Sequence, residues 1–347
     1  MHVALVAPET VHHREPPLHP ARERFERVAT LLAECGHRVT VLTTPWWEAD
    51  LEAFETDGVT YRVVADAPGR GYRLRLPLAL RRAAPDVVHV DAGFSAAVGP
   101  ARYGARLARV PVVGEFYDLA FDADAVTGVD RLVAPAETVR TRLREAGAAA
   151  ADVSVVPDPV DLDLIEATPP ATAHEDDIVF AGRLDSDGNL ESLLLALAEL
   201  RAFDWSATVV GDGPLRSEHR RQARELRIDD RVRFVGDLDR RERVGVYRAA
   251  RAFVQTARRR VFAEELLWAL ASGCVGVVEY HADSGAHELV ERRDRGLRTT
   301  DETELVDALR SLSEYERRDR DADFDEYDRA AVAARLEECY RAAGAEG

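Results

Sequence analysis

Short apolar segments alternate with helical patterns along almost the whole chain. Several segments of the first half are rich in β-branched residues and end at Gly, Pro or Asp, as buried parallel strands do. They are HVALVAP, HRVTVLTT, VTYRVV, DVVHVD, PVVGEFYD, RLVAPA and VSVVPD. After the first, residues 21–35 place Phe25, Val28 and Leu32 on one stripe, and Gly36 ends the predicted helix. This alternation predicts βαβ units and a parallel sheet covered on both faces.

The alternation stops once and then restarts. The tract Ile165–Asp177, IEATPPATAHEDD, is rich in Pro, Thr and acids and has no periodicity, which predicts a domain linker. The strand-like segments IVFAGR, ATVVGDG, VRFVGD, AFVQT and CVGVVEY follow, with helices predicted near Leu190, Leu215, Arg241, Ala263 and Ser284. The predicted organisation is a first domain over 1–164, a linker over 165–177, a second domain over 178–325 and a closing helix over 326–347 that packs back across the first domain.

Length and composition limit the class of protein. At 347 residues the chain exceeds one typical core of roughly 100 to 150 residues, so two α/β domains with a cleft between them are expected. No apolar stretch reaches the roughly 18 residues of a membrane-spanning helix. The N-terminal MHVALVAPE lacks the basic region of a signal peptide, so we expect a cytoplasmic protein. Cys35, Cys274 and Cys339 form no metal-binding spacing and are expected to be reduced.

The charge is strongly negative and has an unusual composition. The net charge is -17, and all 46 basic residues are arginine. A negative chain repels phosphates and anionic lipid, so this charge argues against a nucleic-acid partner and gives no support to a peripheral membrane contact. An acidic, lysine-free composition resembles that of haloarchaeal cytosolic proteins, in which carboxylates hold water and cations at high salt. The composition therefore predicts a halophilic protein.

Three glycine turns end strands of the second domain. Ligands of open α/β sheets bind at the carboxyl ends of strands, where helix N-termini present free N–H groups to anions. Glycine lets the backbone approach a diphosphate closely, and an arginine adds a charged fork. The turns contain Gly182 and Arg183, then Gly211, Asp212, Gly213 and Pro214, and finally Gly236. Any one of them alone is more typical of an ordinary tight turn than of a ligand site.

The series as a whole resembles the donor domain of family 4 glycosyltransferases of the GT-B fold. The matching stretches are FAGRLDSDGNLESLLLALAEL, VVGDGPLRSEHRRQARELRIDDRVRFVGDL, VYRAARAFVQTARRRVFAEELLWALASGCVGVVEY and GAHELVE. In the first domain they are AECGHRVTVLTT, PDVVHV, DRLVAPAETVRTRLREAG and VSVVPDPVDLDLI. The resemblance implies an α/β protein with two Rossmann-like parallel-sheet lobes facing across a cleft.

The same resemblance implies an activity. The chain is expected to move a hexosyl-type sugar from a nucleoside diphosphate sugar to a sugar, lipid-linked or other hydroxyl acceptor, retaining the anomeric configuration and using no metal or other cofactor. The amides of the turn from Gly211 to Gly213 are expected to help hold the diphosphate. The donor-binding residues that it implies are Gly182, Arg183, Asn189, Gly211, Asp212, Gly213, Pro214, Gly236, Leu238, Glu264, Glu265 and Leu266.

Several family positions are occupied by unexpected residues. Arg183 matches the Arg of the family's GRL…KG motif, which grips the diphosphate, but the Lys position falls on Gly188 or Asn189. The family's E-x7-E pair falls on Arg260 and Trp268. A cation and an indole therefore stand where the family uses carboxylates to accept hydrogen bonds from the donor sugar and the ribose.

Glu264 and Glu265 are the nearest substitutes for that pair. Glu264 lies one helical turn before Trp268 and shares its face. The alternative interpretation, which we favour, is that both are solvated acids that stabilise a helix N-terminus.

The first domain departs from the family too. The GG turn after the first strand is replaced by PETVHHREPPLHPARER, and a frequent active-site His is replaced by Tyr117. His12, His13 and His19 in this loop lack a carboxylate partner pattern, so we interpret them as exposed loop residues rather than metal ligands.

The acceptor candidates lie at two places in the first domain. Trp46 and Trp47 follow the second strand, and Asp118 follows Tyr117. The two indoles either stack an acceptor sugar or pack on their own domain.

Three functions remain open at this point. The first is an active, divergent glycosyltransferase. The second is a non-catalytic GT-B-like subunit that binds or scaffolds an active transferase, since several catalytic positions have changed together. The third is another GT-B enzyme such as a sugar-nucleotide epimerase. Fold alone does not decide among them.

Overall fold

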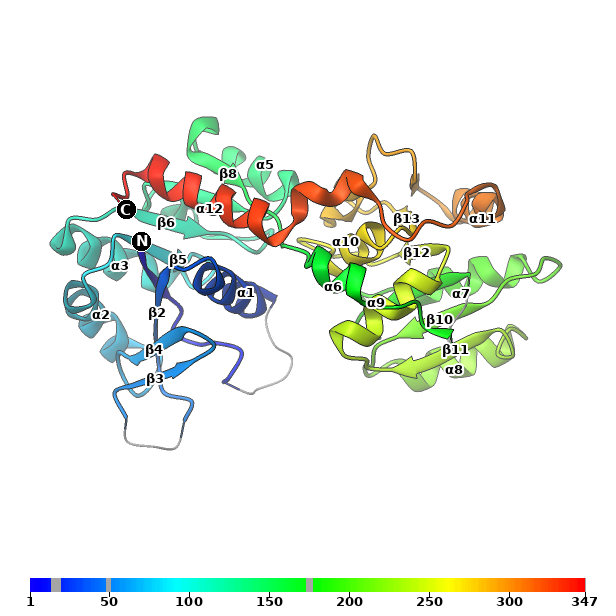
Figure 1. The fold of residues 1–347 in the computed structure, drawn as a ribbon, viewed down its shortest axis with the longest axis horizontal. Coiled ribbons are helices and arrows are strands. Elements are labelled where there is room, and N and C mark those ends of the chain that lie inside the picture. The colour runs from blue at the N-terminus through cyan, green and yellow to red at the C-terminus, as the bar shows by residue number, and fades with distance from the viewer. Residues whose placement is uncertain (14–19, 48–50, 173–176, 347) are drawn as a thin grey trace. The chain divides into compact units, whose positions relative to one another are not determined.

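The chain forms two compact units, each with its own sheet (Figure 1). A computed structural model describes residues 1–13, 20–47, 51–172 and 177–346. The first unit comprises Met1–Asp158 and Arg329–Gly347, and the second comprises Pro159–Asp328. In the described part of the chain, no helix is long and apolar enough to cross a membrane.

The first unit contains an eight-stranded sheet of order β3-β4-β2-β1-β5-β6-β7-β8. Every neighbouring pair is parallel except β3 and β4. The strands are β1 His2–Val6, β2 Arg38–Thr43, β3 Ala53–Thr56, β4 Val59–Val63, β5 Val87–Asp91, β6 Val112–Glu115, β7 Arg131–Ala134 and β8 Val153–Val155. The chain runs outward from β1 to β4 and then returns to β5, so the strand order reverses between β1 and β5.

The described residues of the first unit form six α-helices beside this sheet. They are α1 Pro20–Glu34, α2 Arg70–Ala83, α3 Ser95–Ala108, α4 Ala123–Val126, α5 Glu137–Glu145 and α12 Arg329–Ala343. The predicted stripe of α1 is buried, and Gly36 has the positive φ of +83° expected after a helix. The closing helix packs on the first unit as predicted: Val332, Leu336 and Tyr340 of α12 join the apolar cluster that α1 forms with the sheet.

The second unit contains a six-stranded, wholly parallel sheet of order β11-β10-β9-β12-β13-β14. The strands are β9 Ile178–Ala181, β10 Ala207–Val210, β11 Val232–Gly236, β12 Ala252–Gln255, β13 Val275–Glu279 and β14 Gly296–Thr299. The α-helices are α6 Leu162–Ala167, α7 Leu190–Glu199, α8 Arg216–Glu225, α9 Arg240–Ala249, α10 Glu264–Ala271 and α11 Glu302–Ser311. Here the strand order reverses between β9 and β12, so a ligand site is expected at their carboxyl ends.

Two features of the second unit differ from the sequence expectation. A helix begins near Ser284 as predicted, but it is a short 3₁₀ helix, Gly285–Leu289. The Ser284 side chain caps it by accepting a hydrogen bond from the amide of Ala286. The predicted linker 165–177 lies inside the second unit. Its first residues belong to α6, which Asp161 caps and whose Ile165 carbonyl accepts a hydrogen bond from Arg248 of α9. Residues 173–176 of that linker lie outside the described residues.

Candidate functional site

The three glycine turns of the second unit lie against one another at the carboxyl edge of the sheet. The amide of Gly182 donates to the carbonyl of Val210 (3.1 Å), and that of Gly211 donates to the carbonyl of Gly236 (2.8 Å). The amide of Gly213 donates to Oδ1 of Asp212 (2.7 Å). These three amides already donate hydrogen bonds within the fold. The turns can therefore fit around a ligand, but these amides do not donate to it.

Close packing between the turns explains why glycine is needed. A Cβ on Gly211 would lie 2.1 Å from the carbonyl oxygen of Gly182, and Gly211 has a φ of +119°. A Cβ on Gly213 would lie 2.4 Å from the carbonyl oxygen of Leu184. Any side chain at either position would collide with backbone. The glycines therefore have a packing role that does not depend on a bound ligand.

Two arginines stand at the carboxyl ends of β9 and β12, where the strand order reverses. The side chain of Arg183 is 51% exposed, and its Nε lies 3.2 Å from Oδ2 of Asp185. Arg260 is half-buried, and its guanidinium lies over the β9 turn: a Cβ on Gly182 would lie 3.7 Å from Arg260 Nη2. No carboxylate of the described residues is within ion-pair distance of Arg260.

The backbone of Arg260 is fixed by the loop that follows β13. Its amide donates to the carbonyl of Asp283 (3.2 Å), and the amide of Gly285 donates to its carbonyl (2.7 Å). An isolated β-bridge joins Arg260 and Ser284. Two guanidinium groups, from two different loops, thus reach one edge of the sheet. Planar guanidinium groups bind phosphate and carboxylate in a bidentate manner, so this edge is suited to an anion.

Asn189 joins two of the loops at this edge. It adopts a left-handed conformation with φ +52° directly before α7. Its Nδ2 donates to the carbonyl of Thr256 (3.0 Å), and Oγ1 of Thr256 donates to the Asn189 carbonyl (2.8 Å). The side chain is engaged within the fold, so it positions the turn after β9 relative to the end of β12.

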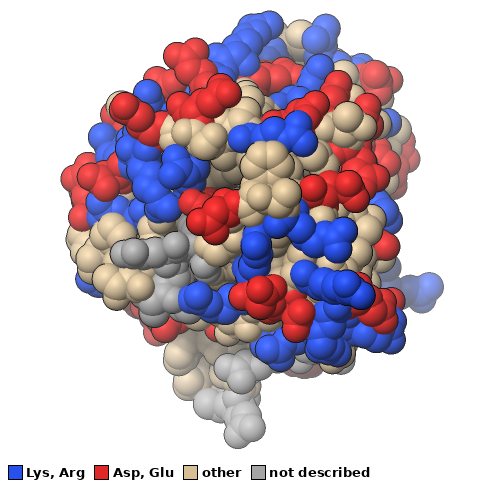
Figure 2. All heavy atoms as spheres, turned by 90° about the vertical axis from the view of Figure 1, so that its right-hand side faces the viewer, with Lys and Arg blue, Asp and Glu red and all other residues tan. Residues whose placement is uncertain are grey.

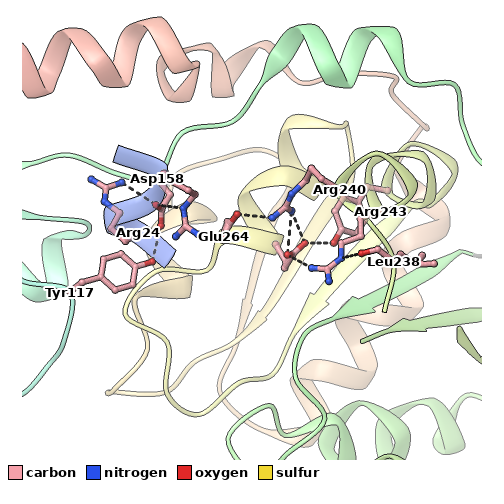
Figure 3. Close-up of polar contacts among 10 residues, drawn as sticks. Arg24, Tyr117, Asp158, Leu238, Arg240, Arg243 and Glu264 are labelled. Atoms are coloured by element: carbon pink, nitrogen blue, oxygen red, sulfur yellow. Dashed lines mark hydrogen bonds and ion pairs between the residues drawn. The ribbon is translucent and has the colours of Figure 1, made fainter. Parts of the chain in front are cut away.

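Glu264 and Glu265 both pair with arginines of α9 (Figure 3). Arg243 Nη1 lies 2.6 Å from Oε1 of Glu265, and Arg240 Nη1 lies 3.1 Å from Oε2. Arg240 Nη2 lies 2.7 Å from Oε1 of Glu264. The hydroxyl of Tyr247 also donates to Glu265. The two carboxylates therefore join α10 to α9.

Charge pairing outweighs burial at Glu265. Burial raises the pKa of this carboxyl, but Arg240 and Arg243 hold the pKa below its ordinary value. Both glutamates lie in the first turn of α10, as the alternative interpretation expected. They are not solvated, since the side chains of Glu264 and Glu265 are only 18% and 16% exposed.

The remaining residues of α10 and the β11 loop are involved in packing. Trp268 is 6% exposed, and the guanidinium of Arg240 lies 4.7 Å from the centre of its ring. Leu266 is fully buried and packs toward β13, which removes its side chain from a ligand site. The carbonyl of Leu238 accepts a hydrogen bond from Nε of Arg243 (2.9 Å).

In the first unit, Tyr117 belongs to a buried charge cluster (Figure 3). Its hydroxyl donates to Oδ2 of Asp158 (2.7 Å). Arg24 of α1 binds Oδ1 of Asp158 (3.0 Å) and Oε1 of Glu115 (2.8 Å), and the side chains of Arg24, Glu115 and Asp158 are all 0% exposed. Burial favours protonation of Asp158, but Arg27 and Arg24 lower its pKa to about 2.

The cluster extends to the C-terminal helix. Nε2 of His89 lies 3.3 Å from Oε2 of Glu115, and Nδ1 of His89 lies 2.8 Å from the hydroxyl of Tyr340. Sequence reasoning singled out Tyr117 but missed Arg24, Glu115 and His89. The available signal was a charge on an apolar stripe, because Arg24 precedes Val28 by one helical turn.

The two acceptor tryptophans pack on their own unit. Trp46 stacks on His12 with ring centres 4.0 Å apart, and it meets Tyr61 edge-on at 5.9 Å. The ring of Trp47 lies 5.7 Å from that of Phe54. These contacts favour the packing interpretation over an open stacking platform.

The other polar candidates of this unit have local partners. Oδ1 of Asp118 accepts from the amide of Leu119 (2.6 Å). His12 lies 3.4 Å from Glu26, and Nε2 of His13 lies 2.9 Å from Oγ1 of Thr44. His19 lies outside the described residues. Within the described ranges, no group of His, Cys, Asp and Glu is arranged to hold a metal ion.

Family models match both units of the chain. Residues 22–164 match the model described as Glycosyltransferase Family 4, and residues 175–314 match the model described as Glycosyl transferases group 1. The two matches together span most of the chain. No curated protein sequence matches the chain significantly.

Solved structures show that the fold is GT-B. HepE from Anabaena in complex with UDP is 17% identical with a TM-score of 0.76, over 97% of this chain and 99% of that chain. Sucrose-phosphate synthase from Thermosynechococcus elongatus is 17% identical with a TM-score of 0.73, over 98% of both chains. The lipopolysaccharide outer core galactosyltransferase WaaB is 16% identical with a TM-score of 0.74, over 98% of this chain and 99% of that chain. Together with the family models, these neighbours support a glycosyltransferase.

Proposed function

We propose that the chain transfers a hexosyl-type sugar from a nucleoside diphosphate sugar to an acceptor hydroxyl, with retention of anomeric configuration and without a metal. The observation that carries the proposal is the pair of arginines, Arg183 and Arg260, at the carboxyl ends of β9 and β12. That edge is where open α/β sheets bind ligands. The neighbour HepE, which shares the fold, is described in complex with UDP.

In this proposal the two guanidinium groups hold the diphosphate. Negative charge grows on the diphosphate as the bond to the sugar breaks, and fixed cations stabilise that charge most in the transition state. The family's motif lysine is missing at Gly188 or Asn189. Arg260 brings a cation to the same edge from another loop, since its guanidinium lies over Gly182. Gly182, Gly211 and Gly236 supply the close-packed backbone beside it.

A donor screen by thermal shift tests the binding step. Nucleoside diphosphates and their sugars are added at increasing concentration, and a ligand at 100 times its Kd stabilises the native state by about 2.7 kcal/mol. We expect Arg183→Ala and Arg260→Ala to weaken binding. The matched control is Arg224→Ala. Arg224 is an exposed arginine in the last turn of α8 and belongs to neither loop, so its replacement should leave the ligand-induced rise in melting temperature unchanged.

Release of the nucleoside diphosphate and analysis of the product test transfer and its stereochemistry. An active transferase releases the diphosphate faster when the acceptor is present, and Arg183→Ala slows that release. Binding without turnover for any donor, unchanged by Arg183→Ala, would refute the enzymatic proposal.

A second candidate is a non-catalytic GT-B-like subunit, and the packing of the family positions favours it. Trp268 is buried beneath Arg240, and the hydroxyl of Tyr117 is bound to Asp158. Glu264 and Glu265 are occupied by α9 arginines. For this candidate we expect association with an active transferase and no turnover by the purified chain.

We also infer that the protein requires salt. The support is the net charge of -17 in a chain without lysine. The melting temperature is expected to rise with KCl into the molar range. A melting temperature that stays constant or falls at molar KCl would contradict this inference.

A further inference from the structure

Helices α2 and α3 carry a basic and apolar outer surface on an acidic protein. α2 contains five arginines and α3 contains two, and neither helix contains Asp or Glu. Four large apolar side chains are exposed on the same two helices: Leu74 (81%), Tyr103 (59%), Leu78 (50%) and Leu107 (44%). We call the exposed residues of Arg70–Ala83 and Ser95–Ala108 the α2–α3 face.

The outer leucines are not needed to hold the helices in place. The inner side of α2 is already filled by Tyr72, Leu76 and Leu80, all 0% exposed. The two helices touch closely, since a Cβ on Gly104 of α3 would lie 2.7 Å from Cδ1 of Leu80. The two helices are therefore well packed, and the exposed apolar side chains of the α2–α3 face are not needed for that packing.

The charges of this face are also uncompensated. Within the described residues, no carboxylate lies within ion-pair distance of the arginines of α2 or α3. Elsewhere in the chain acids and arginines are mixed: Figure 2 shows one face on which the two kinds of side chain are interspersed, and α8 pairs Arg221 with both Glu218 and Glu225. Seven unpaired cations on two adjoining helices are thus a local exception to the net charge of -17.

We propose that the α2–α3 face docks on a membrane surface that contains anionic lipid. Arginines near such a surface are attracted to its headgroups, and leucine and tyrosine side chains enter the boundary between headgroups and acyl chains. A nucleic acid would use the arginines but would gain nothing from exposed leucines. The combination of both kinds of side chain is what selects a lipid surface. The net charge of the whole chain argues against such a contact, but the charge of this face is positive.

Vesicle flotation tests the proposal and needs neither donor nor acceptor, so its outcome is separate from that of the proposed sugar transfer. The full chain is mixed with vesicles of phosphatidylcholine alone or with one third phosphatidylglycerol, in 0.3 M and in 2 M KCl, after circular dichroism has shown that it is folded at both salt concentrations. We expect flotation with the anionic vesicles only. Binding should weaken at 2 M KCl, because the screening length there is below about 3 Å.

Matched variants separate the two contributions. Arg73→Gln/Arg81→Gln should weaken binding about 25-fold, at about fivefold per arginine. The control Arg221→Gln/Arg224→Gln on α8 removes the same charge and should bind as the unaltered chain does.

Leu74→Ser should weaken binding about tenfold at either salt concentration, since burial of a leucine contributes roughly that much. The control Leu51→Ser changes another exposed leucine, 53% exposed and outside both helices, and should have no effect. Circular dichroism confirms that each variant is folded.

Three results would overturn the proposal. The first is no flotation with anionic vesicles at either salt concentration. The second is an equal loss in the α2 and α8 arginine variants, which would indicate attraction without a defined face. The third is full binding by Leu74→Ser together with loss in Arg73→Gln/Arg81→Gln, which would indicate a polyanion such as nucleic acid as the partner.

Discussion

Replacing Arg24 by methionine removes the central cation of the buried cluster in the first unit. Arg24 binds Glu115 through Nε (2.8 Å) and Asp158 through Nη1 (3.0 Å), and it also donates to the carbonyls of Val156 (2.9 Å) and Pro157 (2.7 Å). Methionine has a similar length but donates nothing. The variant therefore leaves two carboxylates buried with reduced compensation.

The expected loss of stability is large and depends on pH. Removing one partner of a buried ion pair costs about 3 to 5 kcal/mol, so we expect Arg24→Met to lower the free energy of unfolding of the first unit by about 4 kcal/mol at pH 7. In the unaltered chain the pKa values of Glu115 and Asp158 are below their ordinary values. The stability that these carboxylates provide is present at neutral pH and is lost as the pH falls. The difference between variant and unaltered chain should therefore shrink as the pH falls from about 4 toward about 2, the pKa of Asp158 in the folded chain.

Arg27→Met is the matched control. Arg27 contacts the same Asp158 through Nε (3.0 Å), but its side chain is 25% exposed and the hydrogen bonds of Arg24 to Glu115, Val156 and Pro157 stay in place, so the loss should be clearly smaller than in Arg24→Met. The two units need not unfold together. Hydrogen exchange of β5 and β6 in urea therefore reports the first unit, with β9 and β12 as the internal reference. Equal losses in the two variants, or a loss below about 1 kcal/mol in Arg24→Met, would refute the reasoning.

Three other substitutions test particular contacts. Burial raises the pKa of Asp91 from 3.8 to about 6, so its negative charge opposes folding at neutral and higher pH. Asp91→Asn should therefore raise the free energy of unfolding in urea by up to about 3 kcal/mol at pH 8 and leave it unchanged below about pH 4. Gly211→Ala places a Cβ 2.1 Å from the Gly182 carbonyl oxygen and should cost about 2 to 4 kcal/mol; an unchanged melting curve would contradict the packing role. Glu265→Gln should lower the melting temperature at pH 7, with the loss vanishing at low pH, and should leave the Kd of any bound nucleotide unchanged; a weaker Kd would instead place Glu265 at the ligand.

The sequence predicted most of the fold because buried strands and amphipathic helices have strong periodic signals. The strands it missed are short and lie at sheet edges. β14 reads GLRT and β3 reads AFET, so neither presents a run of apolar residues. The β3–β4 hairpin did carry a local signal: Asp57 and Gly58 form its turn with φ of +50° and +74°, as a DG pair in a two-residue hairpin does.

The candidate site was less readable than the fold. Glycine turns marked the sheet edge at which the candidate site lies, but the residue pattern does not show that Gly211 packs on the Gly182 carbonyl. Comparison with the family pattern identified Arg260 only as a position where the family's glutamate is missing. Its guanidinium lies over Gly182, and its backbone is held by a bridge to Ser284, 24 positions further along the chain. Such long-range placement leaves no periodic trace.

In the family pattern the cations hold the diphosphate, and the carboxylates contact the donor sugar and the ribose. This chain retains cations at the sheet edge but not the pair of carboxylates. Arg183 keeps the family's arginine, and Arg260 brings a second cation to the sheet edge from a position where the family has a glutamate. The pair of carboxylates is gone, and the nearest acids are held by Arg240 and Arg243. Cations beside the diphosphate act on both binding and rate, because the diphosphate is charged before transfer and gains charge as the bond to the sugar breaks, whereas the missing carboxylates remove contacts to the sugar and the ribose. Under the proposed function we therefore expect nucleotide-sugar binding to be better preserved than turnover. Binding and turnover must therefore be measured separately, because only turnover distinguishes a slow transferase from a subunit that retains the fold and the ligand but not the reaction.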